Sequence, residues 1–278
     1  MLLKILGVIA VLFVTLVAYL GFMRGRLDRF MTRDWVELRP PPAEETFDPK
    51  MVADLPVTAQ RYLLHAIQPG TLLAGSVYLE MEGRIGLQPG GEKLPLSAQE
   101  ILAAPAGFIW KASAGSGLMQ ISGYDYYRRD EGGMRWFLWG FIPVMAAQSP
   151  DLTRSAAGRV AIEAVAWLPS ILVGSDRVRW ETLDDRSVRV YIRVGDEETE
   201  SVLHVSTDGR LERVEIMRWE LEGLDGSPGY LKSIAELAGE EREFKGYRIP
   251  TEVRLISRAG TPLENPFFEA TVLSADYQ

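Results

Sequence analysis

Two carboxylates stand where acid–base chemistry could take place. Glu163 lies within the apolar stretch of residues 160–168. Burial there would raise the pKa of its carboxyl group unless a cation pairs with it, and Arg159 lies one helical turn earlier. Asp125, flanked by tyrosines, is the second candidate. Both are candidate catalytic residues, and for both a structural ion pair is the simpler explanation.

Other familiar chemistries lack their residues. The chain of 278 residues has no cysteine and two histidines, His65 and His204. It therefore has no thiol nucleophile and too few imidazoles for a multi-histidine metal site. Neither a G-x-S-x-G elbow, a phosphate-binding loop nor an H-E-x-x-H motif is present. We expect no metal and no cofactor, and the formal net charge of −8 argues against nucleic acid as a partner.

Aromatic side chains suggest a different activity. They concentrate between residues 124 and 141, in a region that reads as strands with apolar residues on both faces. Such strands are covered on both sides or line a cavity, so ordinary core packing and an apolar ligand groove both fit. The candidate ligand-binding residues are Trp110, Tyr124, Trp136, Trp139, Phe141, Trp167 and Trp180.

The N-terminus predicts a membrane anchor. Residues 5–23 carry no charge, and a helix of that length crosses a hydrocarbon core of about 30 Å. Its length and its bulky end favour an uncleaved single-pass anchor over a cleaved signal peptide. Residues 24–48 are expected to form a basic, proline-rich linker. Its arginines favour a cytoplasmic C-terminal domain and can meet anionic lipid headgroups.

The remaining residues, 49–278, predict one β-rich domain. A short amphipathic helix is expected at 55–67. Apolar and polar residues then alternate in many segments between 75 and 275, which is typical of half-buried strands, and Asp208-Gly209 predicts a type I′ hairpin. Residues 155–168 interrupt the alternation as a helix that is apolar on most sides. We expect an α+β fold, predominantly antiparallel β, in which a large twisted or half-barrel sheet covers this helix.

A resemblance supports this architecture. The segments that carry it are Gly107–Ala112, Ile121–Asp125, Gly158-Arg159, Glu163-Ala164, Trp167–Pro169 and Val178–Trp180. Taken together, they resemble the DUF6544 (also DUF6920) family of uncharacterised bacterial membrane-linked proteins, over roughly residues 50–278. That family implies no activity, but its layout is similar at the fold level to the LolA/LolB lipoprotein carriers. The resemblance implies a bacterial inner membrane location, and the carrier analogy favours the periplasmic side.

The function that these observations favour is a membrane-anchored binding protein for a hydrophobic ligand, a lipid or lipidated partner, without covalent chemistry. A carboxylate-dependent hydrolase acting on membrane-derived substrates and a structural partner-binding module are the alternatives. A carrier should contain a continuous apolar cavity without converging titratable groups. An enzyme should present Glu163 or Asp125 to an open cleft beside a second polar group.

Overall fold

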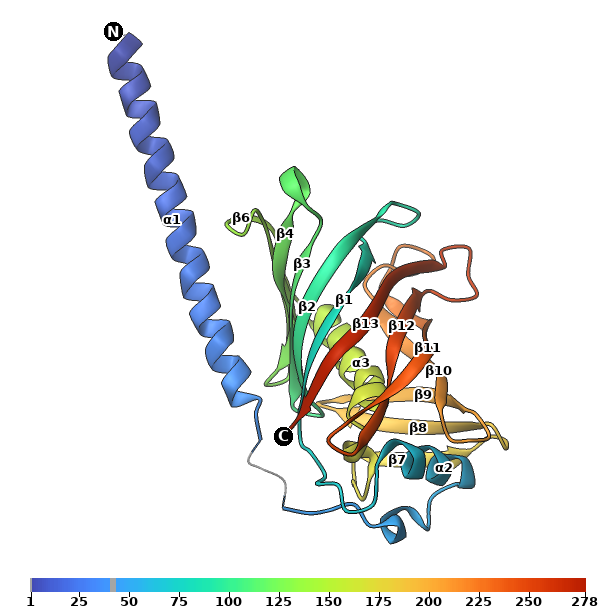
Figure 1. Ribbon diagram of the computed structural model, residues 1–278. Coiled ribbons are helices and arrows are strands. Elements are labelled where there is room, and N and C mark those ends of the chain that lie inside the picture. Colours follow the sequence, from blue (N-terminus) through green and yellow to red (C-terminus); the bar gives the residue numbers. More distant parts are fainter. Residues whose placement is uncertain (1, 41–43) are drawn as a thin grey trace.

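A single antiparallel sheet dominates the computed structural model, which describes residues 2–40 and 44–278. The sheet has thirteen strands in the order β6-β5-β4-β3-β2-β1-β13-β12-β11-β10-β9-β8-β7. It curls into a half-barrel around one central helix, and a long N-terminal helix projects away from the domain (Figure 1). The expected α+β half-barrel is confirmed.

The helices and strands have the following bounds. The α-helices are α1 (Leu2–Glu37), α2 (Val57–Ala66) and α3 (Pro150–Trp167), and short 3₁₀ turns occupy Pro49–Val52, Gly117–Met119 and Pro169–Leu172. The strands are β1 (Val77–Gly86), β2 (Lys93–Ala103), β3 (Gly107–Ala114), β4 (Ile121–Arg128), β5 (Glu131–Leu138), β6 (Ile142–Gln148), β7 (Val178–Thr182), β8 (Ser187–Val194), β9 (Glu197–Val205), β10 (Leu211–Glu220), β11 (Gly229–Phe244), β12 (Tyr247–Ser257) and β13 (Asn265–Tyr277).

The central helix α3 lies in the concave face of the half-barrel. Ser149 caps its N-terminus by accepting a hydrogen bond from the backbone N–H of Leu152, and Pro150 occupies the first turn, where its missing N–H costs nothing. Strands from both halves of the sheet pack against it. Its last residue, Trp167, is buried, and the Tyr277 hydroxyl donates to the Trp167 carbonyl oxygen at 2.9 Å. The prediction of an apolar helix covered by the sheet is confirmed.

Helix α1 does not end with the apolar segment. It continues to Glu37, through residues expected to form a linker, and its last third packs on the convex face of β2, β3 and β4. Met31 is buried there against Ile101 and Ile109. These strand residues alternate with the inward-facing core residues, so both sheet faces are apolar at this place. Residues 41–43 of the expected proline-rich linker lie outside the described residues.

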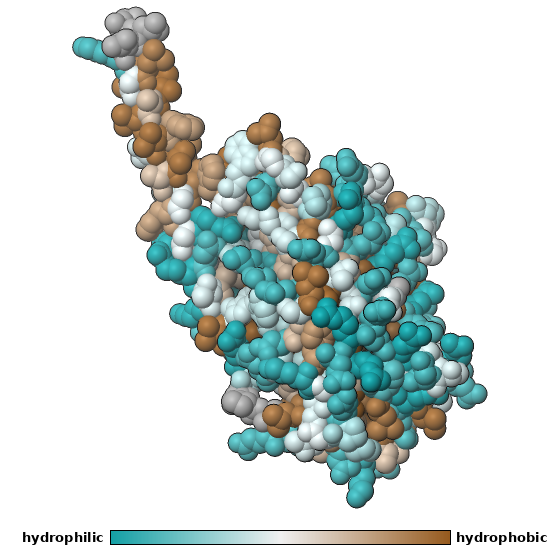
Figure 2. All heavy atoms as spheres, viewed as in Figure 1, coloured by the Kyte–Doolittle hydropathy of each residue, from teal (hydrophilic) through white to brown (hydrophobic). Residues whose placement is uncertain are grey.

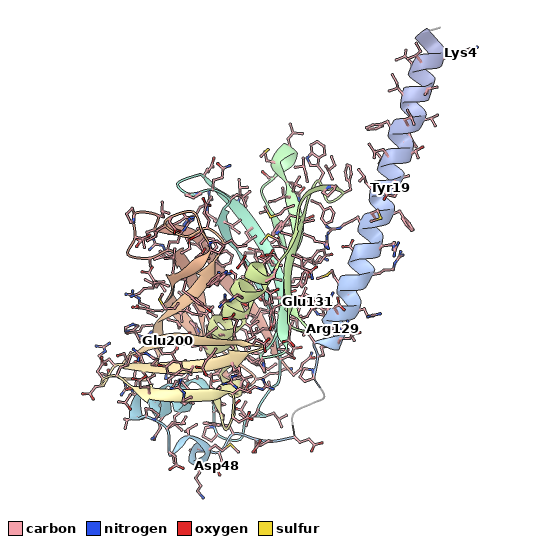
Figure 3. All side chains as sticks on the ribbon, turned by 180° about the vertical axis from the view of Figure 1, so that it is seen from behind. Lys4, Tyr19, Asp48, Arg129, Glu131 and Glu200 are labelled. Atoms are coloured by element: carbon pink, nitrogen blue, oxygen red, sulfur yellow. The ribbon has the colours of Figure 1, made fainter. Side chains whose placement is uncertain are left out.

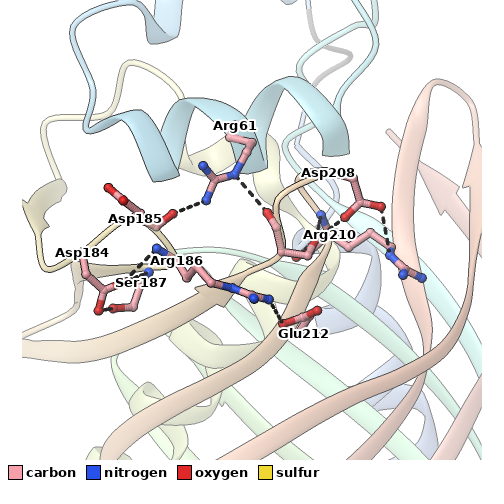
Figure 4. A network of polar contacts seen from close by, with 9 residues as sticks. Arg61, Asp184, Asp185, Arg186, Ser187, Asp208, Arg210 and Glu212 are labelled. Atoms are coloured by element: carbon pink, nitrogen blue, oxygen red, sulfur yellow. Dashed lines mark hydrogen bonds and ion pairs between the residues drawn. The ribbon is translucent and has the colours of Figure 1, made fainter.

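Helix α2, confirmed close to its expected bounds, closes the end of the half-barrel opposite the long hairpins. The Arg61 guanidinium donates to the backbone carbonyls of Asp185 (2.6 Å) and Ser206 (3.0 Å) (Figure 4). Gly209 lies directly beneath this helix, and a Cβ there would come within 2.7 Å of the Arg61 carbonyl oxygen. The hairpin therefore needs glycine both for space and for its φ of +99°.

One turn expectation is wrong. Asp208-Gly209 is not a type I′ turn, because Ser206 pairs with Arg210 around three residues and only Gly209 has a positive φ. The two-residue loop with positive φ at both positions is instead Arg129-Asp130, between β4 and β5. The apolar residues 134–142 are divided between two strands, β5 and β6. Their turn at Trp139-Gly140 also has two positive φ values, which the apolar sequence conceals.

We predict that Trp167→Ala destabilises the domain by about 3–5 kcal/mol, because truncating a buried tryptophan removes apolar burial and leaves a cavity. Glu92→Ala, in the exposed β1–β2 turn, is the control and should change stability by no more than about 0.5 kcal/mol. Denaturant unfolding of both variants measures this. A Trp167→Ala protein as stable as the wild type would contradict the covered-helix arrangement.

Candidate functional site

A cavity of about 150 Å³ lies between α3 and the strands on both sides of the seam between β1 and β13. Its walls come from strand segments near the hairpin ends of β1, β10, β11, β12 and β13, together with β2, β3, β4 and one side of α3. Its lining residues are Met81, Ile85, Glu100, Trp110, Asp125, Arg159, Ile162, Glu163, Ala166, Trp167, Ile216, Arg218, Ser233, Ile234, Ala235, Leu237, Val253, Leu255, Ile256, Phe267 and Phe268.

One wall of the cavity is ionic and centred on Arg159. Its guanidinium lies 2.7 Å from the Glu163 carboxylate, 3.3 Å from Asp125 and 3.5 Å from Glu100. The face of the same group lies against an aromatic ring, with its central carbon 4.3 Å from the centre of the Phe108 ring. Both candidate carboxylates therefore meet at one arginine, and the expected Arg159–Glu163 pair is present.

Regular secondary structure brings these groups together. Arg159 and Glu163 are four residues apart and share one side of α3. Glu100, Trp110 and Asp125 are direct cross-strand neighbours on β2, β3 and β4, so they form one row across the concave face. The helix pair lies over this row, which places all three carboxylates around Arg159.

The charges of this wall are unequal. Burial raises the pKa of Glu100 well above its usual value, and the neighbouring Glu163 carboxylate raises it further. Burial also raises the pKa of Asp125, while Arg159 and a 2.9 Å hydrogen bond from the Trp136 indole oppose the shift. Burial alone would lower the pKa of Arg159, but the three carboxylates raise it. Of these carboxyl groups, Glu100 is therefore the one whose protonated form burial and the neighbouring Glu163 favour most.

Arg218 adds a second, half-buried cation. Its Nε donates to the Ser155 carbonyl oxygen at 3.1 Å, and no carboxylate of the described residues lies within ion-pair distance of its guanidinium. Burial lowers its pKa, and Arg159 lowers it further. The buried indole N–H of Trp110 has no acceptor among the described residues. The cavity thus offers hydrogen-bond donors to an occupant.

Sequence reasoning missed Glu100 and Arg218, although a signal existed. Glu100 continues the buried alternation of Leu96 and Ala98, and Arg218 continues that of Val214 and Ile216. A charged residue at a core position of a strand is unusual unless it has a partner. That irregularity marked both residues as members of a buried polar cluster.

The expected aromatic ligand-binding residues divide into separate groups. Trp110 and Trp167 line the cavity. Trp136 packs at a tilt against Trp110, with the ring centres 5.9 Å apart, and its indole donates a hydrogen bond to Asp125. The other four are elsewhere: Tyr124 contacts α1 on the convex face, Trp139 and Phe141 lie at the β5–β6 turn, and Trp180 packs at the other end of the sheet on β7. In the described part of the chain no group of three or more His, Asp or Glu side chains could hold a metal ion.

The cavity matches neither the expectation for a carrier nor the expectation for an enzyme in full. It is mostly apolar, as a carrier requires, but titratable groups converge on one wall, which the carrier model did not include. Glu163 and Asp125 do lie beside further polar groups, as an enzyme would require, but Arg159 binds both of them. The arrangement can accommodate an apolar group and donate hydrogen bonds to an acceptor at its end.

Fold and site together define an α+β half-barrel protein with an internal amphipathic cavity. The chain belongs to the DUF6544 family, a family of unknown function, whose model matches residues 45–269. No curated protein matches the chain.

Two solved structures are similar in fold. A LolA superfamily protein from Nitrosomonas europaea aligns with a TM-score of 0.43 and 11% identity, covering 80% of this chain and 92% of its own. A DUF1329 family protein from Desulfovibrio piger aligns with a TM-score of 0.40 and 13% identity, covering 74% and 86%. These similarities concern the fold alone.

We predict that Glu100→Gln makes stability less dependent on pH. The pKa of Glu100 is higher in the folded than in the unfolded state, so wild-type stability falls as pH rises above about 4.3, by up to about 1.4 kcal/mol per pH unit until the folded-state pKa is reached. Glutamine mimics the protonated acid and removes this contribution. Chemical unfolding between about pH 5 and 8 measures the slope.

Two variants serve as controls for this experiment. Glu82→Gln, on the exposed side of β1, should leave the slope unchanged. Glu163→Gln should lower stability, because it removes the closest anionic partner of Arg159. A wild-type slope retained in Glu100→Gln would mean that Glu100 is ionised in the folded protein.

Proposed function

We propose that this protein is a membrane-anchored binding protein that holds the apolar part of a lipid-like ligand in the cavity against α3. The observation that carries the proposal is the cavity itself, apolar on most of its wall and lined on one side by buried donors. Burial of apolar ligand surface supplies the affinity, at about 25 cal/mol per Å². The polar wall fixes the orientation.

The dimensions of the cavity limit the ligand. A cavity of about 150 Å³ suits a group about as large as benzene or a short branched chain, rather than an entire phospholipid. At the ionic wall the carboxylates are occupied by Arg159, and the donors that have no carboxylate partner among the described residues belong to Arg218 and Trp110. The ligand atom at that wall is therefore a hydrogen-bond acceptor, such as an ester, carboxylate or alcohol oxygen.

The proposed anchor is the apolar part of α1. Its side chains between residues 5 and 17 are exposed over their whole circumference, which costs free energy in water and none in a bilayer. The helix continues from this part into the segment packed on the sheet without a break. An uncleaved anchor keeps that continuity.

A carboxylate-dependent hydrolase is the second candidate. The observation that favours it is the proximity of two buried carboxyl groups, Glu100 with a raised pKa and Glu163, because hydrolysis uses an acid and a base in one site. A screen of ester and glycoside substrates tests it. Turnover by the wild type that falls by about 10²–10⁴ in a folded Glu163→Gln variant would favour the hydrolase over the carrier.

We predict that Ala235→Phe prevents ligand binding. The added ring occupies the cavity that Ala235 lines on β11. Native mass spectrometry of the full chain extracted in detergent should detect a small co-purified molecule on the wild type and on Ala146→Phe, a change at an exposed position of β6. It should be absent from Ala235→Phe. Equal occupancy of both variants would place the ligand outside the cavity.

We also predict that the full chain stays in the membrane fraction after alkaline extraction and keeps its N-terminal residues. Deleting residues 5–23 should release it, because the hydrophobic contact with lipid is then lost. Immunoblotting and N-terminal sequencing provide the measurement. A mature chain beginning beyond residue 20 would show that the segment is a signal peptide.

A further inference from the structure

A series of contacts aligns α1 with the hairpin β4–β5. Near the lower end of the helix, Glu37 pairs with Arg129 in the turn between these strands, and Asp34 lies 3.0 Å from Arg128. Figure 3 shows Arg129 beside that end of α1. Asp34 is buried, so this ion pair is part of the packed interface rather than a surface contact.

Further up, the same alignment continues. The Tyr124 hydroxyl donates to Asp28, and the Arg24 guanidinium lies 4.5 Å from the centre of the Phe137 ring on β5. The helix and the hairpin therefore run side by side from residue 37 to residue 24. This fixes the direction of the apolar segment relative to the domain.

The alignment determines how far the hairpin tips reach. Strands rise about 3.3 Å and helices about 1.5 Å per residue. Trp139 lies two residues beyond Phe137 along the hairpin, a distance that corresponds to about four residues of helix. Trp139 is therefore level with about residue 20 of α1, inside the apolar segment. Figure 3 shows Tyr19 at about the height of these hairpin tips.

The tips at this height are apolar and exposed. Leu118 and Met119 of the β3–β4 connection are 80% and 67% exposed, and Trp139 at the β5–β6 turn is 45% exposed. Figure 2 shows hydrophobic residues on the end of the domain beside α1, and further hydrophobic patches in the middle and at the far end of the visible face. We call Leu118, Met119, Trp139, Val144 and Met145 the apolar rim; all five are exposed.

The apolar rim has a defined conformation. Trp139 is held at a φ of +51°, a conformation that bulky residues rarely adopt. Its indole N–H donates to the Leu118 carbonyl oxygen at 3.1 Å, which ties the two tips together. The turn thereby keeps a large aromatic side chain exposed, where burial in the core would be more favourable in water.

We propose that the apolar rim is immersed in the interface of the same phospholipid bilayer that α1 crosses. Tryptophan is enriched at membrane interfaces, and Leu, Met and Val gain free energy by leaving water. Arg26 and Arg29, exposed on α1 just past the apolar segment, meet the headgroups at that level. The packing of α1 on the sheet fixes the direction of its apolar segment, so the apolar rim lies at the level of the lipid into which that segment extends.

The orientation has a consequence for the cavity. Ile85, Leu255 and Phe267, which line it, lie close to the hairpin ends of their strands, at the end of the half-barrel where α1 projects. With the rim in the bilayer, this end faces the lipid. A lipid-like ligand could then pass into the cavity without crossing bulk water, an inference that rests on the proposed function.

The natural absence of cysteine makes the test direct. Single cysteines at Leu118, Met145, Leu12 and Val57 of the full chain, each carrying an environment-sensitive fluorophore, are reconstituted in vesicles of phosphatidylcholine and phosphatidylglycerol. Leu12 reports the anchor, and Val57, an exposed apolar residue on α2 at the far end, is the matched control. Nitroxides placed near the headgroup or deep in the acyl chain report depth.

The expected result is a blue shift at Leu118 and Met145 with quenching by the shallow nitroxide. Leu12 should be quenched by the deep one, and Val57 by neither. Quenching at Leu12 without any at Leu118 and Met145 would overturn the rim and leave the anchor intact. No quenching at Leu12 would overturn the anchor. Equal quenching at Val57 and Leu118 would indicate non-specific adsorption and also contradict the rim.

A variant separates immersion from folding. Leu118→Ser combined with Met119→Ser removes apolar surface from an exposed turn, so the melting temperature should stay unchanged. The fluorophore at Met145 should then lose part of its blue shift. An unchanged spectrum in this folded variant would show that the tips do not enter the bilayer together.

Discussion

Covering α3 is the constraint on which the rest of the structure depends. This helix is apolar on most of its circumference, and one flat sheet could bury only one side of it. Thirteen antiparallel strands cover the helix by curling around it, and the natural twist of the sheet contributes to this curvature. The cavity is the volume that the helix and the curled sheet leave between them.

Burying α3 also buries its charges. Arg159 and Glu163 cannot stay charged in an apolar interior without partners, since breaking such a pair costs several kcal/mol. Glu100 and Asp125 on the sheet complete the group, and the pKa of Glu100 is raised by burial and by Glu163. The result is a local polar wall in an otherwise apolar cavity.

The convex face of the sheet has a different role. Over β2, β3 and β4 it is covered by the last third of α1, so the apolar N-terminal segment and the domain form a continuous unit. A flexible linker would have allowed any orientation of the half-barrel. The packed helix selects one, in which the hairpin ends and the apolar segment point the same way.

The sequence by itself determined the apolar N-terminal segment, the antiparallel class, the enclosed helix and the Arg159–Glu163 pair. Each depends on local periodicity or on spacing within one element. Only the tertiary structure decided that Asp125 and Glu100 join that pair, that Trp110 and Trp167 line the cavity, and that Tyr124 and Trp139 do not. Strand register places residues far apart in sequence in one row, and a change of register by one residue would reverse which face each side chain occupies. The docking of α1 was hidden for the same reason: Ile101, Ile109 and Tyr126 read as ordinary strand residues until the fold puts them on one outer face.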